Sequence, residues 1–155
     1  MDTPFTIVMY RTFHAQRNAI RPGMADIGLS PGQPKILHYL LNHDGCMQRE
    51  LADACDIEPA TVSRLLDKME EDGLVRREIP PKRTRACCVS LTDRGREAHA
   101  LWHRLCLETE NHALQGFDDE ERTKFREYLN RMYGNLTGKS LSNRTIHAKL
   151  LFFIG

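Results

Sequence analysis

Residues 48–77 read QRELADACDIEPATVSRLLDKMEEDGLVRR, and this stretch decides the fold. It predicts a short helix over Gln48–Cys55, a turn at residues 56–58, and a second helix that Pro59 opens at its first position, where a missing N–H costs nothing. Gly73 is expected to end the second helix, because glycine readily adopts the left-handed conformation found just past a helix. Apolar residues at helical spacing mark the inward faces, and they are Leu51, Ala52, Cys55, Val62, Leu65, Leu66 and Met69. Two short helices joined by a tight turn form a helix-turn-helix unit.

A basic hairpin is predicted directly after this unit. Its strands are expected at Leu74–Ile79 and Arg85–Leu91, since apolar and polar residues alternate in the second of them. Residues 80–84 (PPKRT) form the connecting loop, because neither proline can donate an N–H to a strand ladder. Residues 74–96 are strongly basic and residues 46–73 net acidic, although the chain as a whole has a net charge of only +1. A local basic stripe is the typical footprint of a phosphate-binding surface.

A helix-turn-helix followed by a basic wing predicts binding to double-stranded DNA through the outward face of the second helix. Arg64 is the best base-reading candidate, because its guanidinium can pair with O6 and N7 of guanine. Thr61 and Ser63 suit phosphate contacts, whereas Pro59 and Ala60 offer only apolar contact, for example to thymine methyl groups. The predicted DNA-binding residues are Gln48, Pro59, Ala60, Thr61, Ser63, Arg64, Lys68, Lys82, Arg83 and Arg85.

Two helices are predicted before the unit. The first is expected over Pro4–Ile20 and is broken at residues 21–24 (RPGM), which combine proline and glycine. The second is expected to begin at Pro31, with Ser30 as its N-cap, and to end near Gly45.

Two more helices are predicted after the hairpin. Thr92 is suited to cap a long helix over Asp93–Leu114. Asp118 is suited to start a last helix that ends near Gly134, with acidic residues in its first turn. The fold class expected is therefore mainly α with a small β-wing: a winged helix-turn-helix head with appended helices.

Residues 48–77 resemble the reading head of the MarR family of transcriptional regulators. Gly28–Gln33 (GLSPGQ) is similar to the family's entry into its second helix, and Val89–Gly95 (VSLTDRG) is similar to its strand-to-helix junction. One departure lies in the wing, where Arg83 stands in place of the family's usual Asp, two residues before Arg85. An acid that would orient Arg85 is therefore missing.

The resemblance implies a single chain with a DNA-binding head at residues 30–91 and dimerisation helices at residues 1–29 and 92–155. It implies a homodimer that binds a pseudo-palindromic operator and usually represses nearby genes. It also implies a pocket between the dimerisation region and the head, where a small aromatic or phenolic effector lowers the affinity for DNA.

Composition and short motifs bear on domain size, on the cellular compartment and on enzymatic activity. A chain of 155 residues, 28% of them charged, fits one soluble domain with its own core. The five cysteines are odd in number and form no CxxC pair, which argues for a reducing compartment. With neither a signal peptide nor an apolar run of ~20 residues, the chain is expected in the cytoplasm and away from membranes. Motifs for phosphate cradling, nucleophilic hydrolysis or zinc proteolysis are absent from the sequence, so we predict neither an enzyme nor a cofactor.

The effector pocket has three candidate residues. His14, Arg17 and His38 are placed to contribute to an anion pocket between the first two helices, since arginine suits a carboxylate. They fit equally well as ordinary surface or interface polar residues. A winged helix that serves protein–protein assembly is the alternative from another functional class.

Metal or redox sensing on the same scaffold is the remaining alternative. His99, His103 and Cys106 lie on one helical face at a spacing that suits zinc or copper, although no fourth ligand is identifiable and they fit a helix interface as well. Cys88, beside the basic wing, is the best candidate for oxidation, whereas Cys55 and Cys87 fall on apolar faces and are expected to be structural.

Overall fold

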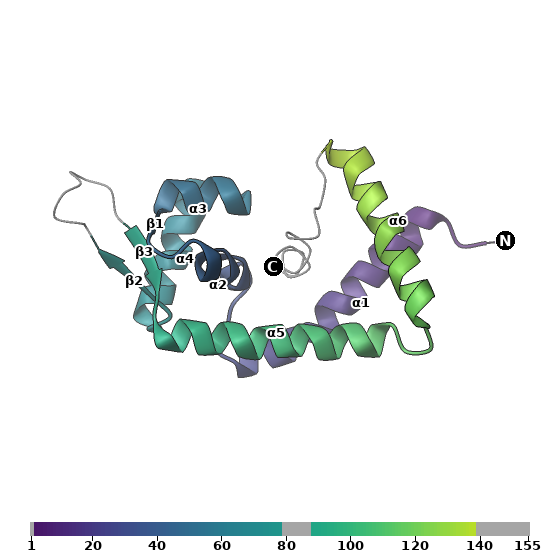
Figure 1. The fold of residues 1–155 in the computed structure, drawn as a ribbon, viewed down its shortest axis with the longest axis horizontal. Helices are drawn as coiled ribbons and strands as arrows, with labels where there is room; N and C mark the ends of the chain where they lie inside the picture. Colours follow the sequence, from purple (N-terminus) through teal and green to yellow (C-terminus); the bar gives the residue numbers. More distant parts are fainter. Residues whose placement is uncertain (1, 79–87, 139–155) are drawn as a thin grey trace.

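The structure is a computed structural model that describes residues 2–78 and 88–138 (Figure 1). Its elements in chain order are α1 (Phe5–Asp26), α2 (Gln33–Asn42), β1 (Cys46–Met47), α3 (Gln48–Cys55), α4 (Pro59–Glu71), β2 (Val75–Glu78), β3 (Cys88–Leu91), α5 (Asp93–Ala113) and α6 (Asp119–Thr137). Figure 1 shows α2, α3, α4 and the sheet, here called the head, gathered around one end of the long α5, with α6 at its other end. The prediction of a mainly α fold with a small β-wing is confirmed.

The helix-turn-helix has the bounds and the inward faces expected from the sequence. The turn begins at Asp56, whose backbone is left-handed (φ 51°), a conformation that aspartate tolerates better than most residues. Val62, Leu66 and Met69 of α4 are fully buried and belong to one core with Trp102 of α5. This packing holds α4 on the scaffold and leaves its opposite face outward.

The sheet contains one strand that the sequence did not reveal. Its order is β1-β3-β2, with all pairs antiparallel, so β2 is an edge strand. The unpredicted β1 has only two residues and pairs Cys46 with Val89, far along the chain. β2 and β3 lie within the predicted strands, and the loop predicted at residues 80–84 lies outside the described residues.

The first helix is longer than predicted. α1 continues through Pro22 to Asp26 instead of ending at Ile20. Ile20 and Met24 are both buried, and a Cβ added at Gly23 would approach Leu105 Cδ1 of α5 to 2.7 Å. Close packing against α5 therefore outweighs the cost of a proline inside the helix.

Two other helix ends differ from the predictions. α2 begins at Gln33, two residues later than expected, because Gly32 takes a left-handed conformation (φ 88°) at the N-cap. The predicted contact of Gln33 is nevertheless present, since the Ser30 N–H donates to Gln33 Oε1 at 2.8 Å. α6 continues past Gly134 and ends at Thr137, with Gly138 as its C-cap.

Many large apolar side chains at the far end of α5, and on the helices near it, are exposed to solvent. None of the residues of α6 is buried, and the exposed large apolar residues in this region belong to α1, α5, α6 and the turn before α6. They are Phe5, Ile7, Val8, Tyr10, Phe13, Leu107, Phe117, Phe125, Tyr128, Leu129 and Leu136. None of the helices in the described part of the chain is long and apolar enough to cross a membrane.

Candidate nucleic-acid interface

α4 presents a polar outward face at its N-terminal half. Pro59, Ala60 and Arg64 are exposed, while Thr61 and Ser63 are half-buried. The fully buried residues of α4 are three or four apart and therefore share one face of the helix. The start of α4 thus has three predicted contact residues that are exposed and two that are half-buried.

Two of the predicted basic contacts are held by neighbours on the same helix. The Arg64 Nη2 donates to Thr61 Oγ1 at 3.3 Å, which folds the guanidinium back over the start of α4. Lys68 Nζ forms an ion pair with Asp72 at 2.8 Å near the end of the helix. Exposed pairs of this kind are weak and can rearrange when a phosphate approaches.

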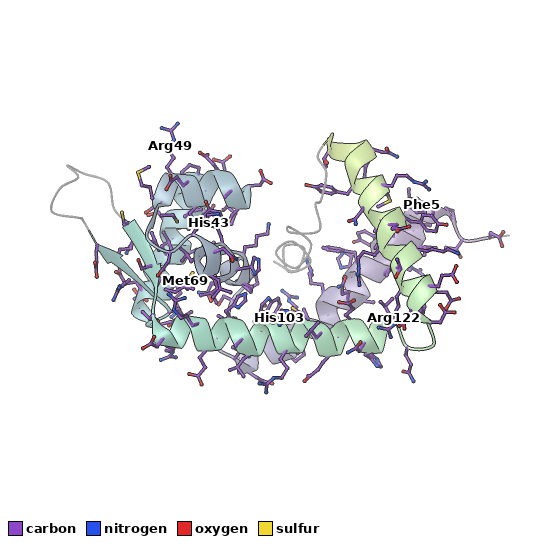
Figure 2. All side chains as sticks on the ribbon, in the orientation of Figure 1. Phe5, His43, Arg49, Met69, His103 and Arg122 are labelled. Carbon is purple, nitrogen blue, oxygen red and sulfur yellow. The ribbon has the colours of Figure 1, made fainter. Side chains whose placement is uncertain are left out.

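The first residues of α3 add a further basic group. The predicted contact Gln48 is half-buried at the start of α3, and its neighbour Arg49 is exposed. Figure 2 shows Arg49 extending from α3 away from the rest of the head. Arg49 was not among the predicted contacts, although a basic residue opening the first helix of a helix-turn-helix was a signal that could have marked it.

The basic stripe is less available than its sequence indicates. Arg77 binds Glu70 and Asp67, Arg76 lies 3.4 Å from Glu78, and Arg96 pairs with Asp44. Of these arginines only Arg77 is largely covered, at 23% exposed, and the more exposed pairs of Arg76 and Arg96 can rearrange when a phosphate approaches. The other wing candidates, Lys82, Arg83 and Arg85, lie outside the described residues.

The residues predicted for the effector pocket have different surroundings. His14 is half-buried and its ring contacts those of Tyr10 and Phe13 on the same helix. Arg17 has a buried Nε without a hydrogen-bond partner among the described residues. His38 is buried and its Nδ1 lies 3.0 Å from Nε2 of His99, which joins α2 to α5.

The His38–His99 pair was not predicted, because the two residues are far apart in the sequence. Burial lowers the pKa of His38 to about 4, and the neighbouring His99 and His103 act in the same direction. Burial also lowers the pKa of His99, with His103 as the second cause. Both imidazoles are therefore neutral near pH 7, as a hydrogen bond between a donor and an acceptor nitrogen requires.

The predicted metal ligands are not brought together. His99 is engaged with His38, and its ring stacks on that of His103 with the centroids 6.5 Å apart. Burial raises the pKa of Cys106 to about 12, which disfavours the thiolate that binds metals. Within residues 2–78 and 88–138, no group of three or more His, Cys, Asp or Glu side chains is placed to hold a metal ion.

The cysteines give little support to redox sensing. Burial raises the pKa of Cys46 and of Cys55 to about 11, so both thiols stay protonated and weakly nucleophilic near pH 7. Cys88 is half-buried in β3, and Cys87 lies outside the described residues. Oxidation of Cys88 therefore stays a prediction.

Comparison with known proteins agrees with this arrangement. The model of the MarR family matches residues 27–86. The chain is 27% identical over 106 residues to a protein from Thauera aromatica named for transcriptional regulation of the hcr operon, covering 68% of this chain and 64% of the relative. It is 30% identical over 109 residues to the HTH-type transcriptional regulator YdgJ of Bacillus subtilis, covering 70% and 66%. The chain therefore matches just under two thirds of the length of these two relatives.

A solved structure extends the similarity to most of the chain. The crystal structure of a MarR-family transcriptional regulator from Silicibacter pomeroyi is 30% identical in sequence and superimposes with a TM-score of 0.65. The match covers 85% of this chain and 89% of that protein, and thus extends beyond the head.

Proposed function

The chain belongs to the MarR family, and from this premise we propose that it is a sequence-specific regulator of transcription that binds double-stranded DNA as a homodimer. The observation that carries the proposal is the outward face of α4, with Arg64 exposed on a helix whose other face is fully buried. A rigid helix of this kind fits the major groove, where base edges can be distinguished. Residues 30–91 form the proposed DNA-binding head.

The proposed homodimer is supported by the apolar residues left uncovered outside the head. In α6, Phe125, Tyr128, Leu129 and Leu136 are all exposed and recur at helical spacing. A contiguous apolar face of this kind is costly in water and is typical of a surface that another chain covers. A second copy would bury it and carry two α4 helices to successive turns of a pseudo-palindromic operator.

We further propose that the regulator is a repressor released by a small aromatic or phenolic effector. Support comes from three buried donor nitrogens that have no hydrogen-bond partner among the described residues: Arg17 Nε, Gln33 Nε2 and Trp102 Nε1. They belong to α2, which is part of the head, and to α1 and α5, which pack against each other outside it. An unpaired buried donor is unfavourable, and a ligand oxygen or a water that accepts from it relieves this cost.

The test of the DNA-binding proposal is a titration of affinity with salt. The probe is a duplex enriched from a random-sequence library by the wild-type protein, and binding is measured by fluorescence anisotropy. We expect affinity to fall steeply as salt increases, because Lys and Arg contacts release counterions from the duplex. No enrichment, or binding that does not depend on salt, would remove DNA as the partner and favour a protein–protein assembly role.

The effector proposal is tested separately by native mass spectrometry of the purified protein and by adding salicylate as an aromatic carboxylate probe. We expect the purified protein to carry a bound aromatic molecule, or salicylate to lower the affinity of the wild type for DNA. In the second case, salicylate should have no such effect on Arg17→Ala. DNA binding that does not respond to the probe, together with protein that carries no small molecule, would contradict the effector proposal and leave the DNA proposal standing.

A further inference from the structure

One carboxylate joins the recognition helix to the base of the wing. Glu70 lies at the C-terminal end of α4, and its Oε2 accepts hydrogen bonds from Arg77 Nε at 2.9 Å and from Arg77 Nη2 at 2.6 Å. Its other oxygen, Oε1, accepts from the backbone N–H of Arg77 at 3.1 Å. β2 is an edge strand with a neighbouring strand on one side only. The backbone N–H of Arg77 therefore finds its hydrogen-bond acceptor in a side chain of α4.

Asp67, one turn earlier on α4, strengthens the same contact. Its Oδ1 lies 2.7 Å from Arg77 Nη2. Hydrogen bonding to Arg77 holds the pKa of Glu70 below its usual value, and hydrogen bonding to Glu70 raises the pKa of Arg77. The Arg77 side chain is only 23% exposed, so its guanidinium is held between the helix and the strand. Two guanidinium hydrogen bonds to one carboxylate oxygen, together with the backbone hydrogen bond to the other, fix both distance and orientation.

The neighbours of these residues have no comparable contacts. Arg76, on the same strand, is 63% exposed and lies 3.4 Å from Glu78 on its own strand. Glu71, next to Glu70, is exposed on α4. The contact between Glu70 and Arg77 is here called the clamp. Each of its two residues has a neighbour of the same charge in the chain, Glu71 beside Glu70 and Arg76 beside Arg77, that can serve as a matched control.

We propose that Glu70 and Arg77 are positioning residues that hold β2, the first strand of the wing, at a fixed place relative to α4, so that helix and strand meet DNA as one preformed surface. This inference rests on the proposed DNA-binding function. Among the described residues β2 pairs with β3 alone, and Glu70 of α4 binds Arg77 of this edge strand. An element that had to be fixed in place during binding would reduce affinity, and the contact with Glu70 fixes β2 before DNA arrives.

The clamp predicts that Glu70→Ala lowers the affinity for DNA, whereas the loss of a negative charge alone would raise it. Removing a negative charge from a DNA-binding helix should strengthen binding, and we expect Glu71→Ala to bind the enriched duplex as tightly as wild type or more tightly. Glu70→Ala removes the same charge but also opens the clamp, so we expect binding about fivefold weaker. Tighter binding by both variants would overturn the proposal.

The arginines provide the second comparison. Arg77→Ala and Arg76→Ala remove the same charge from adjacent positions of β2, and we expect the first to weaken binding more. Combining Glu70→Ala with Arg77→Ala should cost no more than Arg77→Ala alone, because a clamp can be opened only once. Strictly additive losses would contradict a shared function.

Hydroxyl-radical footprints separate positioning from a general loss of stability. With Glu70→Ala we expect weaker protection in the flanks, where the wing lies, and unchanged protection at the centre of each half-site, where α4 lies. Uniform loss of protection together with a lower Tm would assign the pair to stability alone. If the wild type itself does not bind the enriched duplex, the proposed function fails; if it binds and only the pairwise predictions fail, the clamp alone is rejected.

Discussion

Helices α4 and α6 both carry apolar residues at helical spacing, yet they bury them to opposite degrees. Val62, Leu66 and Met69 of α4 are 0% exposed. In α6, Tyr128 is 56% exposed and Leu129 37% exposed. The head completes its core within one chain, whereas the described residues leave an apolar face of α6 uncovered, which the proposed homodimer would bury.

The long α5 belongs to both regions and links them. Near its middle, Trp102 is fully buried in the same core as the inward face of α4, while Leu107 further along is exposed. A helix of 21 residues is stiff over this length. The way the far ends associate would therefore decide how two heads are spaced.

The largest effect is expected in the core of the head. Trp102→Ala removes the largest fully buried side chain and should lower the free energy of unfolding by about 3–5 kcal/mol, because a cavity remains. Urea denaturation followed by circular dichroism measures this loss. Tyr128→Ala is the control on α6, and a loss as large as that of Trp102→Ala at the same protein concentration would contradict the contrast between the two helices.

The next largest effect is expected in self-association. Leu129→Asp places a charge within the apolar face of α6 and should weaken dimerisation about 30-fold or more, corresponding to about 2 kcal/mol. Analytical ultracentrifugation measures the dissociation constant. Thr123→Asp, which adds the same charge to another side of α6, is the control; equal association of wild type and Leu129→Asp would place the interface elsewhere.

A smaller effect is expected at the DNA surface. Arg64→Ala should cost about 1–3 kcal/mol of binding free energy and relax the preference for one base. Binding to a panel of single-base variants of the enriched duplex measures both changes. If every duplex lost affinity equally, Arg64 would be a phosphate contact and not a base-reading residue.

Much of the head followed from the sequence, because its signals are local. The turn at residues 56–58, the start of α4 at Pro59 and the cap of α5 at Thr92 depend on residues within one or two helical turns. The DNA-binding candidates on α4 could be named for the same reason, since one face had to be apolar.

The features that the sequence did not reveal depend on distant partners. β1 exists because Cys46 pairs with Val89, and α1 continues past Pro22 because Gly23 packs closely against Leu105. Arg77 and Arg96 were assigned to a basic stripe, and only the fold shows that Glu70 and Asp44 engage them. Spacing along α5 likewise suggested that His99, His103 and Cys106 bind a metal. The fold shows that His99 instead lies within hydrogen-bond distance of His38 on α2.

The smallest effect is expected from pH, at the junction between α2 and α5. The pKa of His38 in the folded chain is about 4, below the ordinary histidine value of 6.5, so the unfolded chain binds a proton first as the pH falls. The contribution of neutral His38 to stability is thus fully present above pH 6.5 and is lost as the pH falls from there towards 4. Urea unfolding across this range should show the decline.

His38→Gln is the variant that tests this assignment, with His43→Gln as the control at an exposed histidine. We expect His38→Gln to flatten the decline of stability with falling pH and His43→Gln to leave it unchanged. A decline as steep in His38→Gln as in wild type would place the titrating group elsewhere.

A homodimeric regulator of this fold would present two copies of α4 to one duplex at a fixed separation. Hydroxyl-radical footprinting of the wild-type protein on the enriched duplex measures this separation. We expect two protected segments on the same face of the DNA, one helical turn or a whole number of turns apart, at about 10 base pairs per turn. A single protected segment bound by one chain, or no protection at all, would contradict it.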